Sequence, residues 1–225
     1  MGFTLVELLV VIAIIVLLSV LAMPAISSLV ASGNMTRNVS ELSDTLELAR
    51  QYATANNTYV WVAFYSSTGT NGLNSLSVAV LASNDGTDPA SASSSWATYN
   101  YGAVPNPQIS LVSKIVTLQQ ISVLGAGRLS VGSLPATPAV SDPANSLATL
   151  QTGNFFTMTL PGTTTSIAFT QAIEFQPSGQ VRNGSSPINV IDLDIQPQKG
   201  TVNDTKNLAV LRINGLTGQT VVYRQ

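Results

Sequence analysis

The chain of 225 residues contains neither cysteine nor histidine. Without cysteine it has no disulfide bonds and no thiolate metal ligands. Without histidine it lacks the commonest general base and the commonest metal ligand. Its many Ser residues and few Lys residues form no catalytic pattern that composition alone would not produce. The sequence therefore predicts a protein that is not an enzyme and has no cofactor.

Charge is also scarce, because only 9% of the residues are Asp, Glu, Lys or Arg and the formal net charge is -2. Such a balance produces no strong field that would select a polyanion or a polycation. Hydrophobic residues make up 45% of the chain, many of them in the first helix. The remaining length suffices for one domain with its own core.

A membrane-length apolar run begins the chain. Between positions 8 and 30, only Ser19, Pro24, Ser27 and Ser28 interrupt Leu, Ile, Val, Ala and Met. About 20 such residues cross a bilayer as a helix. A secretory signal peptide has a basic start and a cleavage site after a shorter run. We therefore expect residues 3–31 to form a retained transmembrane helix.

One carboxylate, Glu7, stands at the start of this run, and the next charge is Arg37. A lone acid costs about 2.5–3.5 kcal/mol at the centre of a bilayer and less near its edge. We therefore expect the charge of Glu7 to have a partner. The alternative is an ordinary single-pass anchor with an interfacial Glu.

The segment Gly2-Phe-Thr-Leu-Val-Glu7 and the apolar run after it resemble the start of type IV pilins and type II secretion pseudopilins. The resemblance implies cleavage after Gly2 by prepilin peptidase and N-methylation of Phe3. It also implies that the Phe3 amine of one subunit pairs with Glu7 of its neighbour during assembly. Family leaders usually carry basic residues, whereas this one is only Met1-Gly2. Either translation starts upstream of Met1, which we favour, or the sequence is trimmed at this end.

The helical pattern continues beyond the apolar run, over residues 32–57. Five apolar residues recur there at spacings of 3 and 4, which is typical of an amphipathic helix; they are Val39, Leu42, Leu46, Ala49 and Ala53. Pro24 predicts a kink, since it removes one backbone hydrogen bond and clashes with the preceding turn. The helix should end near Asn56-Asn57.

Residues 58–225 favour strands, with Ser/Thr/Pro-rich loop-like insertions around 83–152. The predicted fold class is α+β, with the long N-terminal helix packed on an antiparallel β-rich, pilin-like head. Acids that alternate with apolar residues near Ile191 indicate a strand with one buried face and one face in water. The predicted strands are 59–65, 76–82, 96–101, 109–118, 155–160, 167–175, 188–195, 208–213 and 220–224.

Three head segments resemble minor pseudopilins of the GspH/FimT type. Residues 42–64 contain an Ala-Arg-x-x-Ala helix end followed by a strand, and residues 173–179 contain Phe-x-Pro-x-Gly. Residues 211–222 resemble a closing hairpin with Gly218 in its turn. The long insertions depart from a compact minor pseudopilin.

Residues 84–88, Asn-Asp-Gly-Thr-Asp, bring several oxygens together, and some pseudopilins hold Ca²⁺ in a loop. Asp85 and Asp88 are the candidates for a cation. The segment lacks the ligand spacing of a calcium loop, so an Asp-Gly turn is the preferred interpretation and no metal is predicted.

These observations predict a structural subunit, of the minor kind, of a type IV pilus-like or type II secretion filament. Its partners would be prepilin peptidase, other pilin or pseudopilin subunits and inner-membrane lipid, with the head on the extracytoplasmic side. One alternative is a DNA-binding minor pilin that uses Arg212, Arg224 and Arg182. The other is a membrane-anchored surface protein that never polymerises.

Overall fold

The computed structural model describes residues 4–68, 74–88, 104, 107–123, 152–159, 164, 166–183, 186–187, 189–199, 202–203 and 207–224. The predicted cleavage site at Gly2 and Phe3 lies outside these residues. So do the predicted strand at 96–101 and most of the insertions between 83 and 152.

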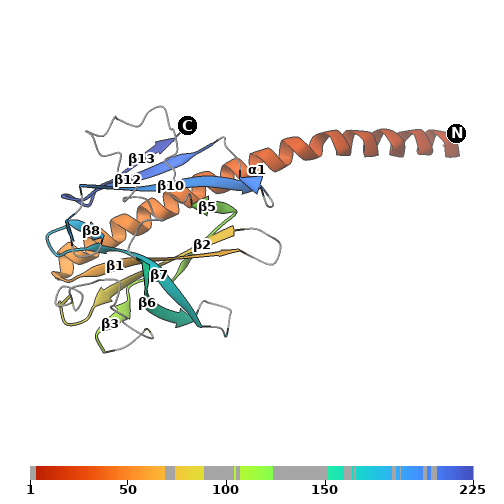
Figure 1. Cartoon of the computed structure of the whole chain (residues 1–225). Helices are drawn as coiled ribbons and strands as arrows, with labels where there is room; N and C mark the ends of the chain where they lie inside the picture. Colours follow the sequence, from red (N-terminus) through yellow and green to blue (C-terminus); the bar gives the residue numbers. More distant parts are fainter. Residues whose placement is uncertain are drawn as a thin grey trace.

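One long helix, α1 (Leu5–Asn56), extends from the N-terminal end into the head (Figure 1). It continues without a break through Pro24, and the kink there stays a prediction. The helix ends where Asn57 takes the left-handed conformation, with φ 50°, and donates its N–H to the Ala53 carbonyl. Asn is one of the few residues that adopt this conformation at low cost. The helix therefore ends at the Asn56-Asn57 pair, as the sequence predicted.

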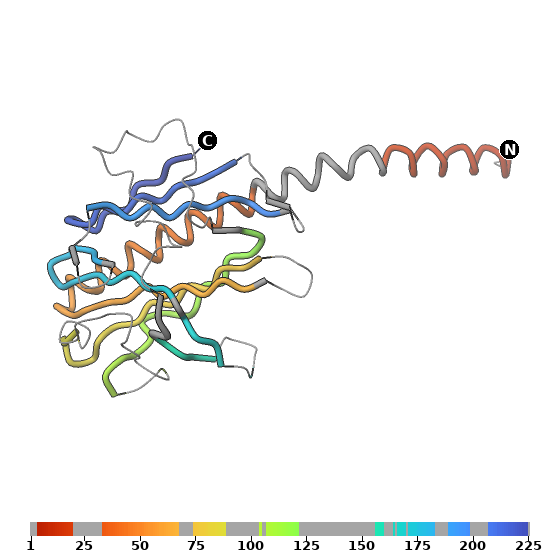
Figure 2. The backbone as a smooth tube through the Cα atoms, viewed as in Figure 1, coloured from red at the N-terminus to blue at the C-terminus, as the bar shows by residue number. Residues whose placement is uncertain are grey.

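The strands form two antiparallel sheets on opposite sides of the head portion of α1 (Figures 1 and 2). In the first sheet the order is β3-β2-β1-β7-β8-β9, with β4 also paired to β2 and β6 to β7. In the second it is β11-β10-β12-β13, with β5 also paired to β10. The first sheet contains β1 (Val60–Thr68), β2 (Asn74–Ser83), β3 (Ile109–Leu111), β4 (Val116–Gln119), β6 (Thr152–Thr159), β7 (Ser166–Phe175), β8 (Val181–Asn183) and β9 (Ser186–Pro187). The second contains β5 (Ile121–Val123), β10 (Val190–Lys199), β11 (Val202–Asn203), β12 (Ala209–Asn214) and β13 (Thr220–Arg224).

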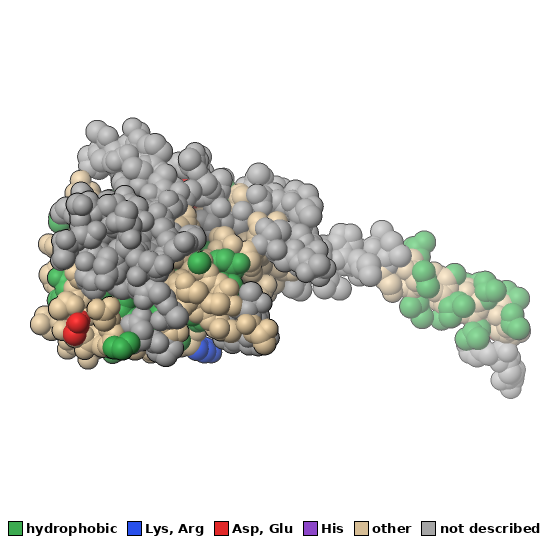
Figure 3. Space-filling view, turned by 60° about the horizontal axis from the view of Figure 1, so that its bottom comes forward, with side chains coloured by type: hydrophobic (Ala, Val, Ile, Leu, Met, Phe, Trp, Pro, Cys, Tyr) green, Lys and Arg blue, Asp and Glu red, His purple; other side chains and the backbone are tan. Residues whose placement is uncertain are grey.

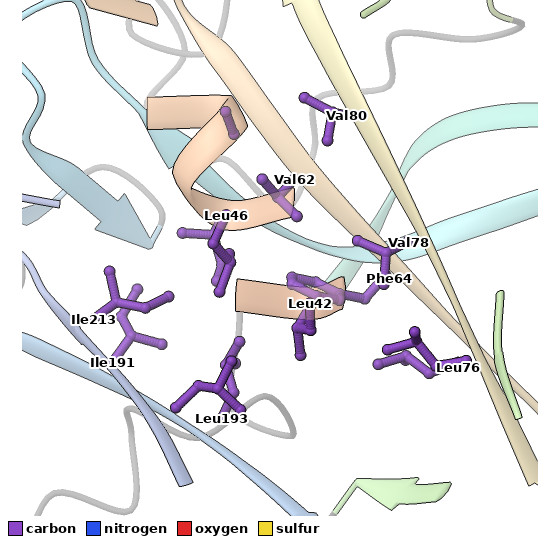
Figure 4. Close-up of a cluster of buried hydrophobic side chains, with 14 of the residues drawn as sticks. Leu42, Leu46, Val62, Phe64, Leu76, Val78, Val80, Ile191, Leu193 and Ile213 are labelled. Atoms are coloured by element: carbon purple, nitrogen blue, oxygen red, sulfur yellow. The ribbon is translucent and has the colours of Figure 1, made fainter. Parts of the chain in front are cut away.

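The main core lies where α1 is enclosed between the two sheets (Figure 4). The apolar stripe predicted for residues 39–53 is fully buried, and Leu42 and Leu46 are at most 1% exposed. Val62 and Val78 of the first sheet and Leu193 of the second belong to the same cluster. The stripe therefore packs against two sheets at once.

The predicted fold class is wrong in this respect. An α+β molecule, with a transmembrane and then amphipathic helix laid on one head, was expected, whereas the described residues are mostly β and place the helix between two sheets. A helical stripe shows that a face is buried but not how many layers bury it. In the described part of the chain, no helix has the combination of length and apolar character needed to cross a membrane.

The first sheet is buried on both faces. Val60, Val62 and Phe64 point to the helix side, while Trp61 and Ala63 belong to a second apolar cluster with Phe156 and Phe169. Because strand side chains alternate between faces, a strand covered on both sides needs a continuous apolar run. This explains the sequence Val-Trp-Val-Ala-Phe in β1.

Strand β10 differs from its prediction of one buried and one wet face. Ile191, Leu193 and Ile195 face the main core as expected, but Asp192 and Asp194 are only 8% and 1% exposed. Asp192 lies opposite Arg212 of β12 and accepts two hydrogen bonds from its guanidinium, at 2.8 and 2.9 Å. The bidentate ion pair with the Arg212 guanidinium compensates for the loss of hydration when this carboxylate is buried.

Candidate assembly site

The N-terminal part of α1 projects beyond the head and carries exposed apolar side chains (Figures 1 and 3). Leu5 is 80% exposed and Leu18 is 58% exposed, and the large hydrophobic residues between them are 45–68% exposed. A helix that is apolar on all sides is stable only where something covers it. Exposed apolar surface of this extent marks a contact with protein or lipid.

Glu7 helps to start this helix. Its carboxylate Oε2 accepts hydrogen bonds from the Thr4 backbone N–H at 2.8 Å and from the Thr4 hydroxyl at 2.7 Å. In return the Thr4 hydroxyl oxygen accepts the Glu7 backbone N–H at 3.3 Å. This is a capping box, which satisfies N–H groups that the first helical turn leaves open.

The role of Thr4 was missed at the sequence level, although Thr4-Leu-Val-Glu7 matches the Ser/Thr-x-x-Glu pattern of such a box. Glu7 therefore has an intramolecular partner at the helix start. Any pairing with a second subunit must use the carboxylate's remaining acceptor capacity or compete with Thr4.

A groove of about 550 Å³ lies between the head portion of α1 and the segment that leads into β4. Basic and acidic side chains both line it, which does not suit a polyanion or a single cation. The lining residues are Arg37, Ser40, Glu41, Asp44, Thr45, Leu48, Ser113, Lys114 and Val116.

Three positions from the GspH/FimT-like segments meet at the far end of α1. Gly179 and Gly218 both have positive φ, 83° and 69°, and their turns lie against the helix. A Cβ on Gly218 would lie 2.4 Å from the Gly179 carbonyl oxygen and 2.9 Å from Cδ of Arg50. Arg50 is held in place by a bidentate pair with Glu47, at 2.7 and 3.0 Å.

The same place joins the two sheets. The N–H of Val181 in β8 donates to the Gly215 carbonyl in the β12–β13 turn, at 2.7 Å. Asn214 fixes that turn, since its side-chain oxygen accepts the N–H groups of Leu216 and Thr217. β8 and the β12–β13 turn thus meet beside the end of α1 and connect the two sheets there.

The two candidate cation ligands have separate protein partners. Asp85 accepts hydrogen bonds from the Ser83 and Thr87 hydroxyls and the Thr87 N–H, at 2.7–3.0 Å. These hydrogen bonds, chiefly the one from the Thr87 hydroxyl, hold the pKa of Asp85 below its ordinary value. Asp88 is buried against the Arg182 guanidinium. Residues 83–88 thus form the expected Asp-Gly turn, with Gly86 at φ 73°.

The arginines proposed for DNA binding are occupied within the head. Arg212 pairs with Asp192 and lies over the Tyr223 ring, with 5.7 Å from its Cζ to the ring centroid. The Arg182 side chain is 12% exposed and contacts Glu174 and Asp88. Arg224 donates to the Thr36 hydroxyl at 3.0 Å. Phosphate contacts require accessible cations, so burial and ion pairing disfavour a DNA-binding role for Arg182 and Arg212, whereas Arg224 is exposed.

The described ranges contain no group of three or more Asp and Glu residues placed to hold a metal ion. Comparison of the chain with protein-family models, curated proteins and solved structures gives no match.

Proposed function

We propose that this protein is a minor structural subunit of a type IV pilus-like or type II secretion filament. It assembles through the N-terminal part of α1 and displays the β-rich head at the filament surface or tip. Prepilin peptidase and other pilin or pseudopilin subunits are its proposed partners.

The observation that carries the proposal is the exposed apolar segment Leu5–Leu18 with Glu7 at its start. Helices packed side by side in a filament would remove this apolar surface from water, which stabilises assembly by about 25 cal/mol per Å² buried. One carboxylate in the segment would favour a register that gives it a positively charged partner.

Before assembly, the same segment would hold the chain at the bacterial inner membrane, with the head on the extracytoplasmic side. Lipid and neighbouring helices both keep apolar side chains dry, so transfer from one to the other needs little change in burial. The head, which has its own core between the two sheets, can remain folded throughout.

The mass of the N-terminal peptide, measured on protein recovered from its native membrane, tests the proposal. We expect a chain that begins at Phe3 with one additional methyl group. The matched control is the same protein from cells without prepilin peptidase, which should retain Gly2 and lack the methyl group. An uncut chain in wild-type cells would contradict the proposal and leave a membrane-anchored surface protein that does not polymerise.

A further inference from the structure

Residues 116–123, the crossing segment, pass from the first sheet to the second beside α1. Strand β4 pairs with β2 in the first sheet and β5 pairs with β10 in the second, and Gln120 is the single residue between β4 and β5. Leu118 and Ile121 on either side of it are at most 2% exposed and belong to the main core. The crossing segment is therefore anchored in both sheets.

The backbone of Gln120 also bonds to both sheets. Its N–H donates to the Asn74 carbonyl at the start of β2, at 3.1 Å, and its carbonyl accepts the N–H of Gln198 in β10, at 2.8 Å. The Gln198 side-chain oxygen accepts the Asn74 N–H at 2.6 Å, which closes a ring of three residues. This ring holds the start of β2 and the end of β10 together.

Two asparagines of α1, one helical turn apart, bind the middle of the crossing segment. Nδ2 of Asn34 donates to Oε1 of Gln120 at 3.1 Å, and Nδ2 of Asn38 donates to the Gln119 carbonyl at 2.9 Å. Asn38 is buried, so its hydrogen bond is shielded from water. The contact therefore joins α1 to both sheets at one place.

A separate contact holds the opposite side of the helix at the same level. Thr36 lies between the two asparagines in sequence, and at 100° per residue its side chain points away from theirs. Its hydroxyl accepts a hydrogen bond from Arg224 of β13 at 3.0 Å. Residues 34–38 of α1 are thus held on two flanks.

The residues that make the contact are not the ones that their local structure favours. Gln120 has a φ of 58°, a left-handed conformation that Gly adopts without the steric cost of a Cβ. Asn34 and Asn38 lie inside a helix, where Asn is less favourable than Ala. Such local costs persist where tertiary contacts outweigh them. In this place the contacts are the hydrogen bonds between α1 and the crossing segment.

We infer that the crossing segment is a clamp that keeps residues 34–38 of α1 folded and docked on the head. Gln120 acts through Asn34, and the Gln119 carbonyl acts through Asn38. Because the clamp is bonded to β2 and to β10, a pull on the N-terminal part of α1 passes to both sheets. This inference does not depend on filament assembly.

Amide hydrogen exchange of α1 residues 35–40, in the full chain in detergent micelles, tests the clamp. Gln120→Gly relieves the backbone strain and leaves the α1 sequence unchanged, so the variant should fold. Its α1 amides should nevertheless exchange about two- to tenfold faster, the factor expected from the loss of one hydrogen bond. Asn38→Ala should have an effect in the same direction, although helix propensity alone would slow exchange.

Two variants serve as matched controls. Gln119→Ala keeps the backbone carbonyl that binds Asn38, and its exchange should equal that of wild type. Ser40→Ala lies at an exposed position of the same helical stretch and should leave exchange unchanged or slow it, because Ala favours the helix. Amides of β1, which lies in the main core, report opening of the whole head and should change less than those of α1.

Unchanged exchange of the α1 amides in either Gln120→Gly or Asn38→Ala would overturn the inference. An equal increase in β1 and α1 would also overturn it, because the contact would then act on the stability of the whole head. Asn34→Ala should add no further acceleration to Gln120→Gly, since both remove the same hydrogen bond. Additive effects would show that Gln120 does not act through Asn34.

Discussion

Replacing Gly218 by alanine is expected to destabilise the head by about 2–5 kcal/mol. Two costs add at this position. Its φ of 69° places any Cβ in the unfavourable left-handed region, and the new atom would lie 2.4 Å from the Gly179 carbonyl oxygen. That neighbour is backbone within the junction of the two sheets, so it has little freedom to move. Denaturant unfolding of the full chain in detergent micelles, followed by tryptophan fluorescence, measures the loss.

Two other glycines calibrate this prediction. Gly179→Ala has the conformational cost but only ordinary contact, 3.4 Å to the Thr54 methyl group, and should lose about 1–2 kcal/mol. Gly33 is exposed within α1 and an added Cβ meets nothing within 4 Å, so Gly33→Ala should stabilise the helix by up to about 1 kcal/mol. Equal effects of the three substitutions would mean that the Gly218 junction does not determine head stability.

The features that the sequence predicted well are local. The 3-and-4 spacing from Val39 to Ala53 placed the buried stripe of α1 because helical periodicity records which face avoids water. Aromatic and β-branched runs placed β1, β2 and β7 within a few residues of their observed bounds. The resemblance of residues 211–222 to a closing hairpin implied a turn at Gly218, and the structure places Gly218 between the paired strands β12 and β13 with a φ of 69°.

The features that the sequence did not reveal depend on contacts between distant residues. The short strands β5, β8, β9 and β11 contain two or three residues each, too few to establish a period. The enclosure of α1 by a second sheet depends on where β10 and β12 pack. Arg182 and Asp88 are 94 positions apart, and no local pattern connects them.

The candidate assembly site and the buried acids of β10 also differ in how far the sequence predicts them. Exposure of the apolar segment from Leu5 to Leu18 follows from composition, since a helix apolar on every side cannot bury all of it against one head. The Thr4–Glu7 box was readable from its four residues. The burial of Asp194 was not, because an acid that alternates with apolar residues usually faces water.

The second large effect is expected from Glu7→Gln, which should prevent incorporation into filaments while the chain stays at the membrane. Gln can still accept the Thr4 N–H, as Glu7 does at 2.8 Å, so the capping box remains and only the charge is lost. Removing one partner of a buried ion pair costs about 3–5 kcal/mol, and about 3 kcal/mol is roughly a hundredfold in an association constant. Quantitative immunoblotting of sheared filaments against the membrane fraction measures the ratio.

Thr4→Ala is the matched control, because it keeps the carboxylate and removes the cap. Loss of an N-cap costs about 1 kcal/mol of helix stability, and this cost falls on the free and the assembled subunit alike. Incorporation of Thr4→Ala should therefore remain close to wild type. If Thr4→Ala failed to assemble and Glu7→Gln assembled normally, Glu7 would act by starting α1, and register in the filament would have to come from other contacts.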